Sequence, residues 1–195
     1  MTATPLEAIA MTLTTAKWSL DDYHRMIDAG ILVDRQVELL NGEIVEMSPE
    51  GTPHAAYSQN AGDYLRSVLG NRATIREAKP ITLPDSSSEP EPDIAIVAPH
   101  RLEVYLQHHP YPQDIFWVIE FSYSSLTKDL ESKSKIYAAS GIPEYWVINL
   151  RSMTLIVFRS PQNSEYTSET TIDQGVIQPI AFTDISISVD RLLGK

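Results

Sequence analysis

The sequence predicts a mixed α/β or α+β fold, in which helices pack on a central sheet. The run 115–122 is almost entirely apolar, as in a central strand that is buried on both faces. An amphipathic segment at about 127–140 and a second apolar run at 144–150 follow it closely. We therefore expect strand, helix and strand to form the unit around which the rest of the chain packs.

The residues before this unit predict alternating helices and strands. Ser19 can cap a helix that ends near Gly30, and Asn41-Gly42 between two alternating segments is typical of a β-hairpin. Pro80 would place a bulge or a sheet edge in the strand that carries it. The remaining elements that we expect here are a turn at 49–53, a helix at 54–69, a strand at 73–83, a loop at 84–88 and a short buried strand at 93–97.

The residues between and after these elements are less regular. Residues 99–114 predict only a connection with one helical turn, and no function is assigned to them. Arg151-Ser152 would form a two-residue hairpin turn after the second apolar run. The last expected strands are 153–158, 165–172 and 185–189.

Length and composition are those of a globular protein. The 195 residues predict one domain over 17–195, preceded by a flexible arm over 1–16. The chain has no cysteine, no signal-peptide pattern and no apolar run near the roughly 20 residues of a membrane span, so we expect a cytoplasmic protein. The net charge of −11 argues against broad, non-specific binding of nucleic acid.

Three acidic residues lie at positions where a carboxylate is unfavourable. Glu38 is in a predicted hairpin strand, Asp93 opens a strand after Pro92, and Glu120 is inside the central strand. A buried carboxylate costs free energy unless a metal or a hydrogen-bond donor compensates it. Magnesium takes oxygen ligands, usually one or two carboxylates together with water and phosphate oxygens. Acids at one height on adjacent strands would suit such an ion.

A lysine lies on the inner face of the predicted helix. At about 100° per residue, Lys133 shares one arc with Leu130 and Tyr137, and this arc packs on the sheet. Lys128 and Lys135 lie roughly on the opposite side, and Lys135 is expected to face water. A lysine beside Glu120 could orient water or stabilise the charge that develops on a phosphate.

Each of these residues also has a purely structural interpretation. Glu38 could face solvent in the hairpin, and Asp93 could simply end a loop. Glu120 and Lys133 could form a buried ion pair without catalysis. His54 begins a helix; it could contact the site or a phosphate, or belong only to the helix cap.

Several motifs together resemble one known family. They are Pro-Asp at 92–93, Ile-Glu-Phe-Ser at 119–122, Asp129-x3-Lys133-x3-Tyr137, Gly-Ile-Pro-Glu-Tyr-Trp-Val-Ile-Asn at 141–149, and Val-Glu-Leu-Leu-Asn-Gly-Glu-Ile-Val-Glu-Met-Ser-Pro at 37–49 followed by His54. This pattern, over about residues 18–160, resembles the Uma-two family of putative restriction endonucleases in the PD-(D/E)XK nuclease superfamily.

The resemblance implies a restriction-endonuclease-like core, with a mixed sheet flanked by helices. Asp93 and Glu120 match the metal-binding acids of the superfamily motif, and Glu38 matches an acid of the N-terminal block. Ser122 stands where the usual lysine of the motif would be. In this family the lysine has moved to the next helix, and Lys133 matches that position. The helical pattern leads to the same residue.

Two functions remain open on the sequence. The first is a Mg²⁺- or Mn²⁺-dependent DNA endonuclease, in which Asp93, Glu120 and Glu38 bind the metal and Lys133 positions the attacking hydroxide. A homodimer would let it cut both strands. The second is a catalytically weak or inert module on a nuclease scaffold, which binds nucleic acid or protein. The acidic net charge favours the second.

Overall fold

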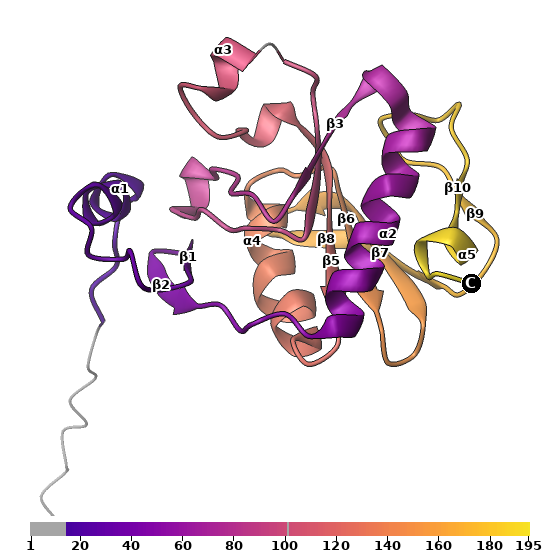
Figure 1. The fold of residues 1–195 in the computed structure, drawn as a ribbon, viewed down its shortest axis with the longest axis horizontal. Helices are drawn as coiled ribbons and strands as arrows, with labels where there is room; N and C mark the ends of the chain where they lie inside the picture. The colour runs from indigo at the N-terminus through magenta and orange to yellow at the C-terminus, as the bar shows by residue number, and fades with distance from the viewer. Residues whose placement is uncertain (1–14, 101) are drawn as a thin grey trace, which may run out of the picture.

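The computed structural model describes residues 15–100 and 102–195, and a six-stranded mixed sheet forms its centre (Figure 1). The strand order is β3-β4-β5-β6-β7-β8; β5 and β6 are parallel, and every other neighbouring pair is antiparallel. The mixed α/β architecture is therefore confirmed. The strands are β3 (Thr74–Glu77), β4 (Ile94–Val97), β5 (Ile115–Ser122), β6 (Glu144–Asn149), β7 (Thr154–Gln162) and β8 (Glu165–Ile172).

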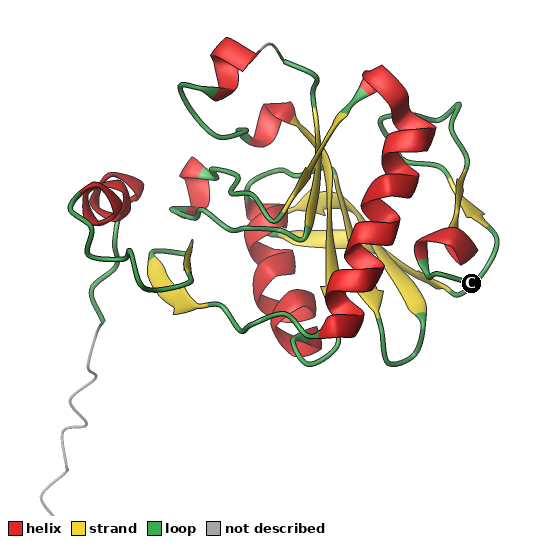
Figure 2. Cartoon of the chain, in the orientation of Figure 1, coloured by secondary structure: helices red, strands yellow, loops and turns green. Residues whose placement is uncertain are grey.

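Helices cover both faces of this sheet, as Figure 2 shows. One face packs against α2 (Thr52–Leu69) and α5 (Val189–Leu192), with β9 (Val176–Ile177) and β10 (Ile187–Ser188) beside them. The other face packs against α4 (Ser134–Ala139). Since both faces are covered, the side chains of β5 are buried on both sides, as its apolar run predicts. No helix in the described ranges is long and apolar enough to cross a membrane.

A small lobe lies beside the main sheet. It contains α1 (Leu20–Asp28) and the antiparallel hairpin of β1 (Val37–Leu40) and β2 (Glu43–Glu46) (Figure 1). The lobe has its own small core around Tyr23 and Leu39. A backbone bridge from Leu39 to Glu89 joins it to the loop that precedes β4. The expected N-terminal helix and hairpin are therefore present.

Some predicted boundaries are wrong for local reasons. The strand expected over 73–83 ends at Glu77, because Ala78 has a positive φ of 44° and Pro80 has no N–H to donate to a ladder. The helix expected from residue 54 begins at Thr52, with Pro53 in its first turn, where proline is favoured. The strand expected over 185–189 is shortened to β10, because the side chain of Ser188 caps α5.

The connections also differ from expectation. A longer loop, residues 150–153, replaces the two-residue turn at Arg151-Ser152, and Met153 adopts a φ of 54°. Residues 99–114 contain the short helix α3 (Leu102–Tyr105) and a 3₁₀ turn at Pro112–Asp114. The predicted flexible arm falls almost entirely outside the described residues.

A buried ion pair joins β6 to β7. The side chain of Glu144 is fully buried and accepts hydrogen bonds from Nε and Nη2 of Arg159 at 2.9 and 2.6 Å. The indole of Trp146 and the backbone N–H of Ile180 also donate to this carboxylate, each at 2.8 Å. Four donors therefore compensate the desolvation of Glu144.

We expect Arg159→Ala to lower the free energy of unfolding by about 3 kcal/mol, because it leaves a buried carboxylate without its counter-charge. Urea unfolding followed by circular dichroism measures this loss. The matched control is Arg35→Ala, which breaks an exposed pair with Glu46 and should cost much less. Equal losses in the two variants would show that the buried pair of Glu144 stabilises the fold no more than an exposed pair does.

Candidate active site

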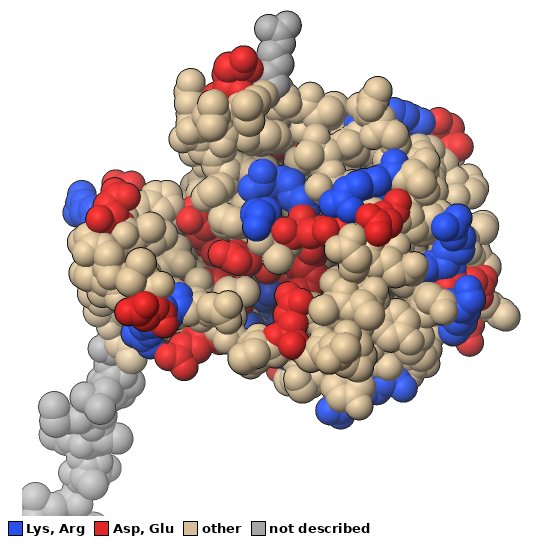
Figure 3. Space-filling model, in the orientation of Figure 1, with Lys and Arg blue, Asp and Glu red and all other residues tan. Residues whose placement is uncertain are grey.

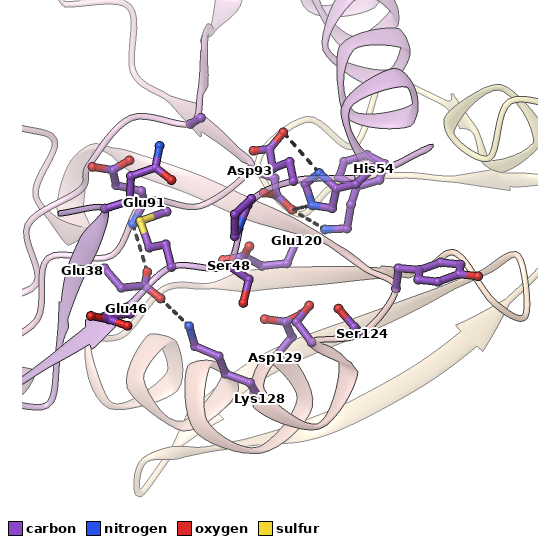
Figure 4. Close-up of a pocket in the computed structure, with 18 of the residues that line it drawn as sticks. Glu38, Glu46, Ser48, His54, Glu91, Asp93, Glu120, Ser124, Lys128 and Asp129 are labelled. Atoms are coloured by element: carbon purple, nitrogen blue, oxygen red, sulfur yellow. Dashed lines mark hydrogen bonds and ion pairs between the residues drawn. The ribbon is translucent and has the colours of Figure 1, made fainter. Parts of the chain in front are cut away.

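An acid-rich cavity of about 1070 Å³ lies between the lobe and the main sheet. Figure 3 shows acidic side chains gathered in this hollow, with basic side chains at its edge, and Figure 4 shows its lining at close range. The loop 47–51 and the loop 123–125 border it. Its carboxylates belong to Glu38, Glu46, Glu50, Glu91, Asp93, Glu120 and Asp129, and its Lys and Arg residues are Arg35, Lys128 and Lys133.

Glu120 points from β5 toward the helix that follows, and only 4% of it is exposed. Its Oε1 accepts hydrogen bonds from Nζ of Lys133 and from the hydroxyl of Tyr137, both at 2.8 Å. The helical pattern predicts this contact between Glu120 on the strand and Lys133 on the inner face of the helix. Burial raises the pKa of Glu120 to about 8; Lys133 opposes the rise, and the charges of Asp93 and Asp129 add to it.

Lys133 is almost completely buried among carboxylates. Burial alone would lower the pKa of this ammonium group. The negative charges of Glu120, Glu38 and Asp129, together with the hydrogen bond to Glu120, outweigh burial and raise the pKa above its ordinary value. Lys133 is therefore a permanent positive charge in the floor of the cavity.

Lys128 does not lie opposite Lys133, where the helical pattern placed it. Its Nζ donates a hydrogen bond to Oε1 of Glu38 at 2.6 Å (Figure 4). The cause is a π-helical turn, Lys128–Lys133, in which the N–H of Ser134 bonds to the carbonyl of Asp129, five residues earlier. The wider turn brings residues five apart closer to one face than a regular α-helix does, and Lys128 and Lys133 both reach Glu38.

Glu38 brings the lobe to the site. It lies on β1 and is 1% exposed, so it is not a solvent-facing hairpin residue. Its two oxygens approach Lys128 at 2.6 Å and Lys133 at 3.5 Å, and the backbone N–H of Glu91 donates to it at 3.4 Å. Although burial acts to raise it, the two ammonium groups hold the pKa of Glu38 below its ordinary value.

Asp93, directly before β4, lies at the same height as Glu120 on the neighbouring strand β5. Ile94 of β4 pairs with Ile119 of β5, so the residues just beyond this pair, Asp93 and Glu120, come side by side. Oδ2 of Asp93 accepts a hydrogen bond from the backbone N–H of Phe121 at 2.6 Å. This bond fixes the carboxylate across the end of β5.

His54 reaches Asp93 from the first turn of α2. Its Nε2 lies 2.9 Å from Oδ2 of Asp93 (Figure 4). Its Nδ1 lies 3.5 Å from Oε2 of Glu50. Burial acts to lower the pKa of His54, but Asp93, Glu50 and Glu120 raise it to about 9. In the described part of the chain, Glu50, His54 and Asp93 form a group whose possible ligand atoms all lie within 4.8 Å of one another.

Asp129 completes the wall beside Glu120. It is 3% exposed, and the hydroxyls of Ser122 and Ser125 donate hydrogen bonds to its Oδ2. Ser122 is the residue that stands in place of the usual lysine of the motif, and here it serves as a donor to Asp129. Burial raises the pKa of Asp129, while Lys133 and the two serines act against the rise.

The structure thus gathers all four predicted site residues, Glu38, Asp93, Glu120 and Lys133, around one cavity. Their roles stay predictions. Sequence reasoning missed three further residues there, Glu50, Lys128 and Asp129. Asp129 was part of the quoted motif and could have been found. The sequence pattern did not mark Glu50 or Lys128 as site residues. Glu50 lies in a loop, and Lys128 would lie on the polar side if the helix were regular.

Comparison with known proteins agrees with this geometry. A crystal structure described as a putative nuclease belonging to DUF820, from Anabaena variabilis ATCC 29413, superimposes with a TM-score of 0.66. It is 18% identical, and the match covers 90% of this chain and 97% of that one, so the two share a fold. No curated protein sequence shows significant similarity.

The sequence model of one family matches residues 20–190, which include the lobe, the sheet and the whole cavity lining. That family is Uma2, described as putative restriction endonuclease. Family and fold together support a nuclease. The chain belongs to the Uma2 family of putative restriction endonucleases.

Proposed function

We propose that the protein is a divalent-metal-dependent endonuclease that hydrolyses phosphodiester bonds of DNA. One observation carries the proposal: Asp93 and Glu120 lie side by side at the end of two paired strands, with the ammonium group of Lys133 2.8 Å from Glu120. Acids that can hold a cation, next to a fixed positive charge, suit the hydrolysis of a phosphodiester. The family description supports the reaction class.

The residues fit a hard divalent cation such as Mg²⁺ or Mn²⁺. Hydrogen bonds in the described part of the chain engage Oδ2 of Asp93 and Oε1 of Glu120, which leaves Oδ1 and Oε2 as donors to an ion. Such ions take oxygen ligands and often only two carboxylates from the protein. The cavity also contains more carboxylates than Lys and Arg side chains, so it would repel a phosphate without a cation.

When bound, the ion would lower the pKa of a water ligand and neutralise charge on the phosphate. Lys133 stays protonated, so it acts as a donor and a fixed charge that holds the attacking oxygen, and not as a general base. Glu120, which also accepts a hydrogen bond from the hydroxyl of Tyr137, fixes the ammonium group on the sheet side. Both oxygens of Glu38 are engaged by lysines, so Glu38 positions Lys133 instead of serving as a main ligand.

DNA as substrate and a homodimer as the active form are part of this proposal. The restriction-endonuclease description of the family supports DNA. In the described part of the chain, Lys133 lines one acid-rich cavity, and we infer that one such site would cut one strand at a time. Two sites in a dimer would cut both strands of a duplex.

We expect Asp93→Asn and Glu120→Gln to lower the cleavage rate more than about a hundredfold, because the stabilisation of transition-state charge by a metal amounts to several kcal/mol. The assay uses plasmid and single-stranded DNA at low salt with Mn²⁺ or Mg²⁺. Circular dichroism should show that both variants remain folded.

Glu46→Gln is the matched control for this assay. Glu46 lines the same cavity but is exposed and paired with Arg35, so its loss should leave cleavage close to wild type. Normal cutting by Asp93→Asn and Glu120→Gln would overturn the site. Equal cutting by all proteins would indicate a contaminating nuclease.

Metal binding separates the nuclease from an inert binding module, which the net charge of −11 favours. We expect Mn²⁺ at a hundred times its Kd to raise the free energy of unfolding by about 2.7 kcal/mol, since the ion binds only the folded state. The melting temperature with and without the ion measures this, and EDTA should reverse it. Asp93→Asn should abolish the shift. A wild-type protein that does not respond would favour the inert module.

A further inference from the structure

One arginine near the cavity has no carboxylate to balance its charge. Arg76 lies on β3, is half-buried, and forms no ion pair in the described part of the chain. Burial lowers the pKa of its guanidinium, and no carboxylate opposes this effect. A charge that is partly withdrawn from water is unfavourable without a counter-charge, so Arg76 is suited to receive an anion. Several other arginines do pair with acids, namely Arg25, Arg35, Arg66, Arg72 and Arg159.

The guanidinium of Arg76 also has donors without partners. Its Nη2 donates a long hydrogen bond of 3.3 Å to the carbonyl of Pro80, and its Nε is buried without a partner among the described residues. Its Nη1 makes no hydrogen bond there and is not among the buried atoms, so a ligand can reach it. The ring of Tyr105, from α3, lies 5.5 Å from the guanidinium carbon and holds the group in place. An arginine that is fixed on one side and open at its edge suits a phosphate.

Arg76 lies on the same face of the sheet as the acids of the site. It pairs with Ala95 of β4, and Ala95 pairs with Val118 of β5. Glu120 is two residues beyond Val118, so the side chains of Arg76 and Glu120 leave the sheet on one side. Two strand spacings and two residues separate their backbones by about 12 Å. A nucleic acid strand covers this distance with a few phosphates.

The residues directly after β3 add a second cation. Ala78 lines the cavity with a φ of 44°, which is uncommon for a residue with a Cβ, and its N–H donates to the carbonyl of Asp93 at 3.1 Å. Strained backbone of this kind clusters at functional sites. The next residue, Lys79, is exposed. Burial and the charge of Glu38 raise the pKa of Glu91 in the cavity lining, and the charge of Lys79 opposes this rise, so its ammonium group lies near the cavity.

We propose that Arg76 and Lys79 form a phosphate-binding subsite, which holds a backbone phosphate of the nucleic acid strand on the β3 side of the cleaved bond. The subsite rests on the proposed nuclease, because it supplies the cations that the acidic cavity lacks. Figure 3 shows basic side chains directly beside the acidic hollow. Arg76 would donate through Nη1, and Lys79 would act as a point charge. Contacts to the backbone add affinity without sequence preference.

The salt dependence of DNA binding tests the subsite without a cleavage assay. The inactive Glu120→Gln protein is the parent, at constant Mn²⁺, and the ligand is a single-stranded oligonucleotide without a terminal phosphate, so only backbone phosphates contribute. Loss of one phosphate contact should reduce the slope of log K against log salt by about 0.7. We expect this reduction in Arg76→Gln and in Lys79→Gln. Arg76→Lys keeps the charge and should keep a slope close to that of the parent.

This measurement separates phosphate binding from a purely structural role of Arg76. If Arg76 only joins β3 to Tyr105, its loss lowers stability and leaves the salt slope of the folded protein unchanged. Lys79 is exposed, so Lys79→Gln should keep its fold and tests the subsite even if Arg76→Gln is unstable. Circular dichroism reports the folded state of each variant.

Arg191→Gln is the matched control. Arg191 also lies over an aromatic ring, 4.3 Å from the centroid of Tyr64, but it belongs to α5 on the other face of the sheet, outside the cavity lining. Its slope should equal that of the parent, and an equal reduction there would overturn the subsite, because the effect would then follow the net charge alone.

The remaining outcomes separate the subsite from the proposed function. Unchanged slopes in Arg76→Gln and Lys79→Gln would overturn the subsite, whereas the nuclease would still stand or fall on cleavage by Asp93→Asn and Glu120→Gln. A parent protein that binds neither single-stranded nor duplex DNA would overturn the subsite and remove DNA as the substrate.

Discussion

The buried ammonium group of Lys133 is the constraint on which the site depends. A charge on the inner face of a helix is unfavourable unless carboxylates surround it. Glu120 supplies one from the sheet, and Glu38 supplies another from the lobe. The contact of Glu38 with Lys133 therefore compensates the charge of the lysine and joins the lobe to the helix that follows β5. Since Lys128 also binds Glu38, two ammonium groups of one helix hold this wall of the cavity.

The two helices that cover the sheet contribute different side chains to the cavity. The helix after β5 provides the positive charge and meets the carboxylate of Glu120 from one face. The first turn of α2 comes from the other face and provides His54. Asp93 links the two layers, since its Oδ2 bonds both to His54 of α2 and to the backbone N–H of Phe121 in β5. A cation at this end of β4 and β5 would therefore contact residues from both layers.

Local patterns explain which parts could be predicted from the sequence. Strand period and helix period are local, so the burial of Glu120 and its contact with Lys133 followed from residues 115–140. The inward turn of Lys128 did not, because a π-helical turn depends on backbone bonds that side-chain periodicity does not encode. The contact of His54 with Asp93 joins residues 39 apart, and only the packing of α2 on the sheet creates it. The fold class was predictable for the same local reason, whereas loop lengths and strand ends depended on single φ angles.

The net charge of the chain says little about how the site would meet a polyanion. Seven carboxylates converge on the cavity, but their oxygens are not equivalent. Those of Glu38 are engaged by two lysines, and Oδ2 of Asp129 accepts hydrogen bonds from two serines. Asp93 and Glu120 each keep one oxygen outside these hydrogen bonds. The acidity that would repel DNA is thus partly compensated within the protein, and the donors that remain are placed to bind cations, which attract phosphate.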